Sequence, residues 1–341
     1  MMTREFTDLH PEFRSVARNL LTAGHPDWTL ITQAGWPGLE IAESLGGAEV
    51  SFAETAVVAE ELGRAAARSS HLGVSLGIGA LLALSPDPAR DDTLSAAADG
   101  TDLPVTVLST GDRPGAGFTL AAGGLSGTAD FVPDAAEATR LLIPAQDSAG
   151  TPVLVEIDPT ATGLAITAQP TLDETRRLAA VTADAVPPTH VWPFSATQHL
   201  LDRGTVAIAA DSLGLAEAML AATVDYVGIR HQFGRPIGSF QAVKHACADM
   251  LVRIRVTRHL VEAAVDAVAA ADPGAQTAVS MAKAYASDTA VAVAGKAMQL
   301  HGGIGYTWES GVHVYLKRAT LNRSLFGSPT AHRRALAARF R

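Results

Sequence analysis

The segment 226–241 combines residue types that could bind a diphosphate group. A long apolar stretch ends at Arg230, an interrupting Phe-Gly pair and a Pro/Gly-containing loop follow, and a new helical pattern begins near Ser239. This order predicts Arg230 at a helix C-terminus, with Ser239 and Gln241 at the N-terminus of the next helix. A guanidinium group beside unpaired backbone N–H groups is suited to pyrophosphate. The alternative is a plain helix–helix turn capped by an arginine.

A second motif, Gln299-Leu-His-Gly-Gly-Ile-Gly-Tyr-Thr307, follows another long apolar stretch. Its glycines remove side chains where a ligand must approach the backbone. The motif is not a P-loop, because the Lys-Ser/Thr pair is missing, and it is not a dinucleotide fingerprint, because no strand pattern precedes it. Taken alone, it is also compatible with a glycine cap and a loop.

The chain that must position these motifs divides into zones with different predicted secondary structure. Helical periodicity covers residues 1–98, short β-prone pieces cover 99–181, a proline-containing linker covers 182–194, and long Ala/Leu/Val stretches cover 195–341. Within the first zone, Ser51-Phe-Ala-Glu54 has the capping-box spacing that starts a helix. The pattern predicts a mainly helical α+β protein, with an N-terminal helical domain, a small barrel-like middle β domain and a C-terminal four-helix bundle.

Composition excludes several classes of protein. The chain has 341 residues and a formal charge of −9, and this acidic balance argues against a general nucleic-acid binder. The single cysteine, Cys247, excludes an internal disulfide framework and a cysteine metal cluster, and no His/Asp/Glu spacing suggests a metal site. Met1–Pro11 lacks the apolar core of a signal peptide, and no uninterrupted apolar run is long enough to span a membrane. We therefore expect a cytoplasmic protein.

Together with two N-terminal motifs, these segments resemble the acyl-CoA dehydrogenase superfamily in a short-subunit form. The resemblance is carried by Ala34-Gly-Trp-Pro-Gly38, Glu60-Glu-Leu-Gly-Arg64, Arg230-His-Gln-Phe-Gly-Arg-Pro-Ile237 with Phe240-Gln241, and Gln299-Leu-His-Gly-Gly-Ile-Gly-Tyr306. It implies FAD as cofactor, an acyl-CoA substrate in which a Cα=Cβ double bond is formed, and an electron-transfer flavoprotein as acceptor. It also implies homo- or heterotetramers whose FAD lies across a subunit interface.

The resemblance assigns cofactor roles to individual residues. Four residues of the first motif match positions that contact the ADP half of an FAD bound mainly by the neighbouring subunit: Arg230, Gln232, Phe233 and Gln241. Four residues of the second motif match the other cofactor loop: Gln299, His301, Gly302 and Gly303. An arginine, amide donors and bare backbone suit a diphosphate and an adenosine.

The catalytic base departs from the family pattern. The family places a glutamate shortly before a Gly-Thr/Ser pair, and Phe326 occupies that position here. Some members keep the base on a C-terminal-domain helix before an arginine, and by this resemblance Asp202 and Arg203 match the pair. Asp202 would then remove the α-proton. The alternative is that Asp202 is only a first-turn acid favoured by the helix dipole.

The middle zone departs from the family as well. Leu108-Ser-Thr-Gly-Asp112 and Gly124–Pro133 replace the stretches that usually hold the flavin ring, so this wall is incomplete or supplied by a different chain. We expect the short subunit of a heterotetramer whose long partner contributes the wall and the glutamate, acting on a bulky acyl-CoA such as a sterol side chain. Two alternatives stay open: a self-sufficient homo-oligomer with Asp202 as base, and a catalytically impaired structural subunit.

Overall fold

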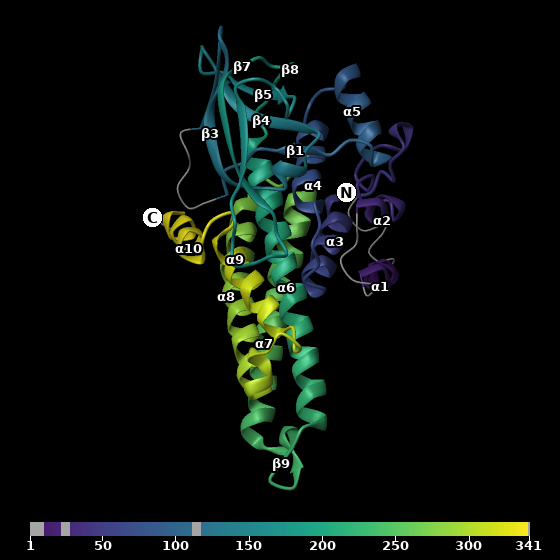
Figure 1. The fold of residues 1–341 in the computed structure, drawn as a ribbon, viewed down its shortest axis with the longest axis vertical. Helices are drawn as coiled ribbons and strands as arrows, with labels where there is room; N and C mark the ends of the chain where they lie inside the picture. Colours follow the sequence, from purple (N-terminus) through teal and green to yellow (C-terminus); the bar gives the residue numbers. More distant parts are fainter. Residues whose placement is uncertain (1–9, 22–27, 111–116, 340–341) are drawn as a thin grey trace.

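The computed structural model describes residues 10–21, 28–110 and 117–339. Helices come first, a sheet follows, and helices return, which confirms the mainly helical α+β fold (Figure 1). The N-terminal helices are α1 (His10–Leu21), α2 (Trp28–Gln33), α3 (Phe52–Arg64), α4 (His71–Leu82) and α5 (Pro88–Ala98). The C-terminal helices are α6 (Thr197–Ile229), α7 (Gln241–Ala269), α8 (Ala275–His301), α9 (Val312–Ser324) and α10 (Pro329–Ala338).

The middle of the chain forms one mixed sheet. Its strands are β1 (Pro104–Thr106), β2 (Gly117–Ala121), β3 (Gly124–Pro133), β4 (Arg140–Asp147), β5 (Pro152–Ile157), β6 (Leu164–Ala168), β7 (Leu178–Val186) and β8 (His190–Pro193). They pair in the order β6-β7-β3-β2-β4-β5-β8, with β1 added beside β4. Both β1 and β2 run parallel to β4, and the other pairs are antiparallel.

The linker predicted at 182–194 is wrong. β7 continues to Val186, and β8 covers most of the rest of the segment. The prolines that suggested a linker lie between these strands and at the end of β8, where ladder hydrogen bonds stop and proline is tolerated.

Helix α3 begins where the capping box predicts it and joins the N-terminal helices to the bundle. The Ser51 hydroxyl accepts the N–H of Ala53 (3.1 Å), and the Glu54 carboxylate accepts the N–H of Ser51 (3.0 Å). Farther along, α3 crosses α6 at a point where only glycine fits. A Cβ on Gly214 would lie 1.9 Å from the backbone oxygen of Glu60.

Helices α6–α8 form an elongated bundle that reaches from beneath the sheet to a far end, which carries the short hairpin of β9 (His231–Gln232) and β10 (Arg235–Pro236) (Figure 1). α6 has the length and apolar composition of a membrane-spanning helix, but 72% of its apolar 18-residue window is buried inside the fold. Its apolar surface is therefore part of the core. The same buried cluster extends from Leu142 in β4 through Leu76 in α4 to Leu213 in α6.

Candidate functional site

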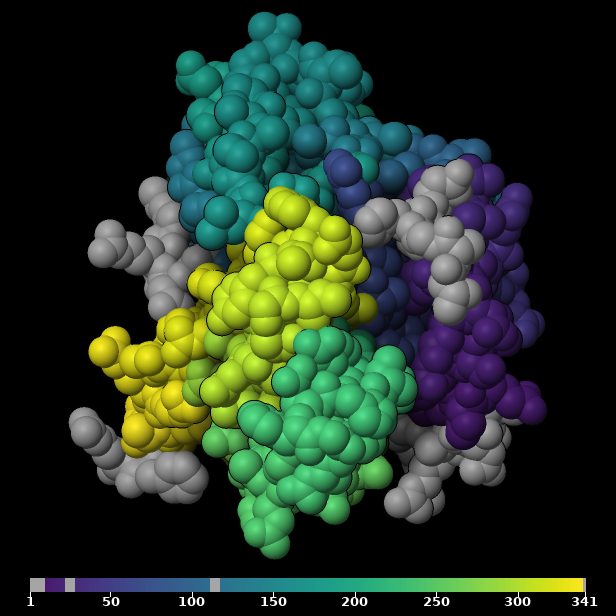
Figure 2. All heavy atoms as spheres, turned by 60° about the horizontal axis from the view of Figure 1, so that its bottom comes forward, coloured from purple at the N-terminus to yellow at the C-terminus, as the bar shows by residue number. Residues whose placement is uncertain are grey.

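The first candidate site is the distal end of the bundle, which we define as residues 226–241 and 299–306. Arg230 is the C-cap of α6, and α7 begins at Gln241 after β9 (His231–Gln232) and β10 (Arg235–Pro236). Both residues are thus at the helix termini where the sequence predicts them. In the space-filling view, the green end of α6 and start of α7 project toward the viewer beside the yellow-green end of α8 (Figure 2).

Side chains of the first motif are directed to solvent. Arg230, Gln232 and Gln241 are exposed, and the ring of Phe233 is 91% exposed. The Arg230 guanidinium makes no hydrogen bond or ion pair with any residue of the described ranges. The N–H groups of Gln241 and Ala242, the first two of α7, also lack a backbone acceptor among the described residues, whereas those of Val243 and Lys244 donate to the carbonyl of Phe240. A free guanidinium beside free helix N–H groups is an arrangement that binds anions.

The second motif reaches the same end from α8. A Cβ on Gly302 or Gly303 would meet no atom within 4 Å, so this backbone is open to a ligand. His301 is buried and stacks on Tyr226 with ring centroids 4.5 Å apart, one turn before Arg230. This contact brings together two motifs that are distant in the sequence. His301 itself faces the protein interior, where its Nδ1 lies 2.7 Å from the carbonyl oxygen of Ala297.

The second candidate site is a cavity of about 380 Å³, lined by residues of α6, α8, α10 and the sheet domain. Asp202 lies in its wall with 9% of its surface exposed, and its Oδ1 accepts a hydrogen bond from Gln198 Nε2 (3.0 Å). Burial raises the pKa of the Asp202 carboxyl, and the Gln198 bond and the charge of Arg339 oppose this rise. The rest of the wall is formed by Ser109, Thr110, Leu201, Thr205, Gln276, Val279, Ser280, Phe326, Gly327, Ala331, His332 and Ala335.

Phe326, at the predicted base position, contacts α6 at a glycine. A Cβ on Gly204 would lie 2.3 Å from Phe326 Cε1. Asp202 lies two residues earlier, about 200° around the helix from Gly204. The helix residue that faces Phe326 therefore has no side chain, and Asp202 is the carboxylate among the residues that line the cavity.

The structure does not bring Arg203 into this cavity. Its guanidinium donates two hydrogen bonds to Glu40 (2.8 and 2.6 Å) and lies 4.4 Å from the ring centroid of Phe52. Gly79 in α4 leaves room for it, because a Cβ there would be 2.7 Å from Arg203 Nε. Arg203 therefore fastens α6 to the N-terminal helices.

A buried lysine holds the loop that carries Phe326. The Nζ of Lys283, in α8, donates to the carbonyl oxygens of Asn322 (3.0 Å) and Gly327 (2.8 Å) and to the hydroxyl of Ser287 (3.1 Å). Lys283 is fully buried. Sequence reasoning missed it, although a lone lysine inside a long apolar helix is a signal, since a buried ammonium group needs several acceptors.

Phe131 in β3 is a second residue that sequence reasoning missed. It has a left-handed φ of 55° and an exposed fraction of 44%. Its N–H donates to Gln169 Oε1 (2.7 Å), and its carbonyl accepts from the hydroxyl of Thr110 (2.9 Å), which lines the cavity. The backbone of Phe131 is thereby bound to a residue of the cavity wall, and its side chain is partly exposed. The end of the predicted stretch 108–112 lies outside the described residues.

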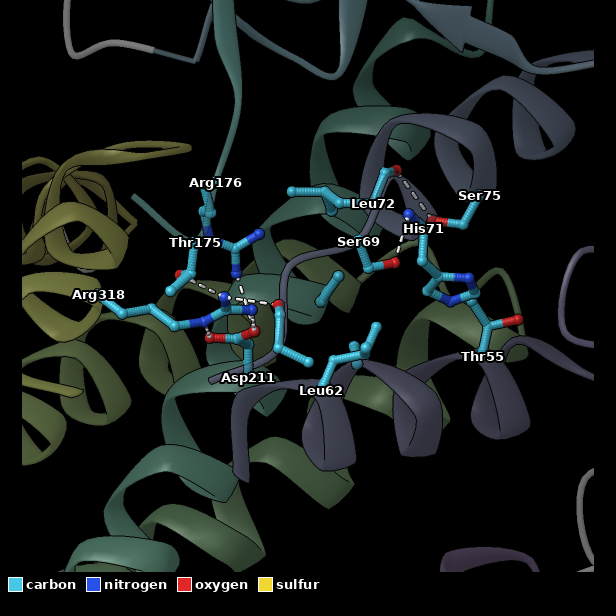
Figure 3. A pocket seen from close by; sticks show the side chains of 13 residues that line it. Thr55, Leu62, Ser69, His71, Leu72, Ser75, Thr175, Arg176, Asp211 and Arg318 are labelled. Carbon is cyan, nitrogen blue, oxygen red and sulfur yellow. Dashed lines mark hydrogen bonds and ion pairs between the residues drawn. The ribbon is translucent and has the colours of Figure 1, made fainter. Parts of the chain in front are cut away.

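A third cavity, of about 20 Å³, is lined by α3, α4 and α6 beside a cluster of paired charges (Figure 3). Burial by itself raises the pKa of Asp211, but Arg176 and Arg318 lower it to about 2. Burial lowers the pKa of His71 to about 4, so this imidazole is neutral at neutral pH. The cavity is large enough for one water molecule. Asp211 pairs with both Arg176 (2.8 Å) and Arg318 (2.5 Å), so this cluster is a structural element.

The two main sites lie far apart on α6. Arg230 follows Asp202 by 28 positions, which corresponds to roughly 42 Å at about 1.5 Å per residue. A FAD molecule is much shorter than this separation. A cofactor whose ADP half is held by the distal end therefore cannot reach the cavity of the same chain.

Two family models match this chain. The model described as "Acyl-CoA dehydrogenase, N-terminal domain" matches residues 2–101, and the one described as "Acyl-CoA dehydrogenase, C-terminal domain" matches residues 194–340. Between them lies the segment that contains the sheet.

Curated relatives and solved structures cover nearly the whole chain. Acyl-CoA dehydrogenase IpdE2 of Mycolicibacterium smegmatis is 34% identical over 314 residues, which cover 91% of this chain and 86% of the relative. A variant of the Tcur3481-Tcur3483 steroid ACAD is 29% identical, with a TM-score of 0.88 over 97% of both chains. The ChsE4-ChsE5 complex from Mycobacterium tuberculosis is 25% identical, with a TM-score of 0.89 over 98% of this chain and 97% of that chain.

Proposed function

The chain belongs to the acyl-CoA dehydrogenase family, and from this premise we propose that it is the short subunit of a hetero-oligomeric flavoprotein. Its partner would be a second acyl-CoA dehydrogenase-like chain that supplies the flavin-ring wall and the catalytic glutamate. Family membership makes the protein a flavoprotein oxidoreductase. Bound FAD supplies the hydride acceptor for forming the Cα=Cβ double bond of an acyl thioester.

The separation of the two sites along α6 supports a FAD that is shared between two chains, and Phe326 at the usual base position favours a partner of a different kind. The distal end would hold the ADP half of a FAD whose ring lies in the partner's cavity. Arg230 would pair with the diphosphate, the N-terminus of α7 would donate to it, and Gly302 and Gly303 would let the adenosine approach the backbone. The open backbone and the unpaired guanidinium fit this group.

The residues around this chain's own cavity also support its assignment as the short subunit. Proton abstraction needs a carboxylate in contact with the substrate α-carbon. Phe326 stands at the usual position, and the helix residue facing it is Gly204. In the proposed assembly, the partner's carboxylate takes the proton, and this chain contributes cofactor binding.

Two similar structures support the partner and the substrate class that we propose. One is described as the ChsE4-ChsE5 complex, and the other as a variant of the Tcur3481-Tcur3483 steroid ACAD. We propose a bulky, steroid-like acyl-CoA as substrate, an electron-transfer flavoprotein as electron acceptor, and the cytoplasm as location.

The test is co-expression of this chain with a candidate partner, followed by measurement of FAD content and turnover. Arg230→Ala should release FAD from the assembly, and Arg253→Ala, an exposed arginine farther along α7, should leave it bound. A homo-oligomer of this chain alone, with one FAD per chain and full turnover, would overturn the proposal.

The burial of Asp202 favours a second candidate function. A carboxyl group with a raised pKa in a cavity is a candidate general base. In this alternative, a self-sufficient homo-oligomer uses Asp202 to remove the α-proton. Asp202→Asn should then abolish turnover while FAD stays bound, and unchanged turnover rejects the alternative.

A further inference from the structure

The contact between Phe326 and Gly204 lies at a boundary of the 380 Å³ cavity. A Cβ on Gly204 would be 2.3, 2.6 and 2.9 Å from three atoms of the Phe326 ring, Cε1, Cζ and Cδ1. The ring is therefore seated against the helix backbone, and no side chain fits between them. Phe326 is only 6% exposed, although it lines the cavity.

Gly204 lies on α6 between the residues that line the 380 Å³ cavity and those that line the buried 20 Å³ cavity. Successive helix residues are about 100° apart. Thr205 and Asp202, which line the 380 Å³ cavity, lie about 100–160° to one side of Gly204. Ala207 and Asp211, which line the buried 20 Å³ cavity, lie about 20–60° to the other side. The aromatic ring stands on the helix between these two faces.

The ring is fixed in this position by its loop. Lys283 Nζ donates to the carbonyl oxygen of Gly327 (2.8 Å) on one side of the loop and to that of Asn322 (3.0 Å) on the other. The Nε2 of His332 lies 2.8 Å from the carbonyl oxygen of Phe326 itself. Three contacts therefore hold the backbone around the ring.

We infer that Phe326 closes the inner end of this chain's own cavity and keeps acyl chains out of it. This inference rests on the proposed function, since it takes an acyl-CoA thioester as the ligand that approaches position 326. The cavity then accepts CoA and very short thioesters, and a longer acyl chain meets the ring. Phe326 is thus a specificity-determining residue, and bulky acyl groups are processed in the partner's cavity.

The test compares binding of CoA and of octanoyl-CoA to the 341-residue chain by titration calorimetry. The wild-type protein should bind octanoyl-CoA no more tightly than CoA. Phe326→Ala should bind octanoyl-CoA at least about tenfold more tightly than CoA, which corresponds to burial of about two methylene groups. Leu325→Ala removes a neighbouring buried side chain that does not line the cavity, and it should keep the wild-type ratio.

Phe326→Leu allows the same comparison if the alanine variant does not fold, with a smaller gain in octanoyl-CoA affinity because leucine still fills part of the space. The inference is overturned if the wild-type protein already binds octanoyl-CoA tenfold more tightly than CoA. It is also overturned if folded Phe326 variants keep the wild-type affinity ratio or bind neither ligand. A gain in octanoyl-CoA affinity for Leu325→Ala as large as that for Phe326→Ala overturns it as well. All these outcomes are read from thioester binding. Failure of the proposed hetero-oligomer would be seen in the FAD content of the co-expressed proteins, so the two failures can be distinguished.

Discussion

Replacing Gly204 by alanine should destabilise the protein, although the same change stabilises an ordinary helix. Inside a helix, alanine is favoured over glycine by about 1 kcal/mol. Here the added Cβ would lie 2.3 Å from Phe326 Cε1, and overpacking of a buried site costs about 1–3 kcal/mol. Because Lys283 and His332 hold the loop, the ring cannot easily retreat. With the helix gain of about 1 kcal/mol subtracted from this cost, we expect a net loss of up to about 2 kcal/mol in the free energy of unfolding.

Two glycines at unhindered helix positions serve as controls. An added Cβ would meet no atom within 4 Å at Gly228, in the same helix, or at Gly295, in α8. Alanine at either position should raise the free energy of unfolding by up to about 1 kcal/mol. Urea denaturation of the three variants, followed by far-UV circular dichroism, measures whether the effect changes sign at position 204.

A second substitution tests the cause. Phe326→Leu removes the Cε1 and Cζ atoms that the new methyl group would approach most closely. Gly204→Ala should therefore be better tolerated in the Phe326→Leu background, with a coupling energy of at least about 1 kcal/mol. If Gly204→Ala stabilises the protein as Gly228→Ala does, or if the double mutant shows no coupling, the packing described for Phe326 is incorrect.

Three further predictions concern charged groups that are buried or half-buried. Burial raises the pKa of Asp134 to about 6, so the contribution of this carboxyl to stability should fall as pH rises from about 4 to 6. Asp134→Asn keeps an acceptor for the N–H of Gly73 (2.9 Å). It should remove this pH dependence and raise the free energy of unfolding by about 1–3 kcal/mol at pH 7. Urea unfolding at pH 4.5 and 7 measures it, and parallel shifts of both proteins would contradict it. Lys283→Met leaves the buried carbonyl of Asn322 and the part-buried carbonyl of Gly327 without this donor and should lower the free energy of unfolding by about 2–4 kcal/mol in the same assay. An unchanged midpoint would show that the lysine does not hold the loop. Arg258→Met leaves the carboxylates of Glu60 and Glu217 with fewer partners and should lower the free energy of unfolding by about 1–3 kcal/mol. If Arg258→Met causes the same loss in a protein in which both glutamates are already replaced, the loss does not come from these ion pairs.

Local features were predictable where the interactions are local. The capping box at Ser51 and the termini at Arg230 and Gln241 depend on a few neighbouring residues, and the structure places them as predicted. The linker at 182–194 was mispredicted because proline marks strand ends as well as linkers, and pairing with distant strands decides between the two. Strand pairing joins segments far apart in the chain, so no local pattern encodes it.

By itself, the sequence determined the family resemblance, the order of helices and sheet, the two cofactor motifs and the missing glutamate at position 326, because each depends on residue types at short spacing. Only the tertiary structure decided how these parts are used. In the folded chain, Arg203 binds Glu40, and Gly204 lies against the ring of Phe326. Roughly 42 Å of helix lies between the distal end and the cavity. The physical reason is that helix rotation and packing, set by contacts along the whole core, determine which side chains meet.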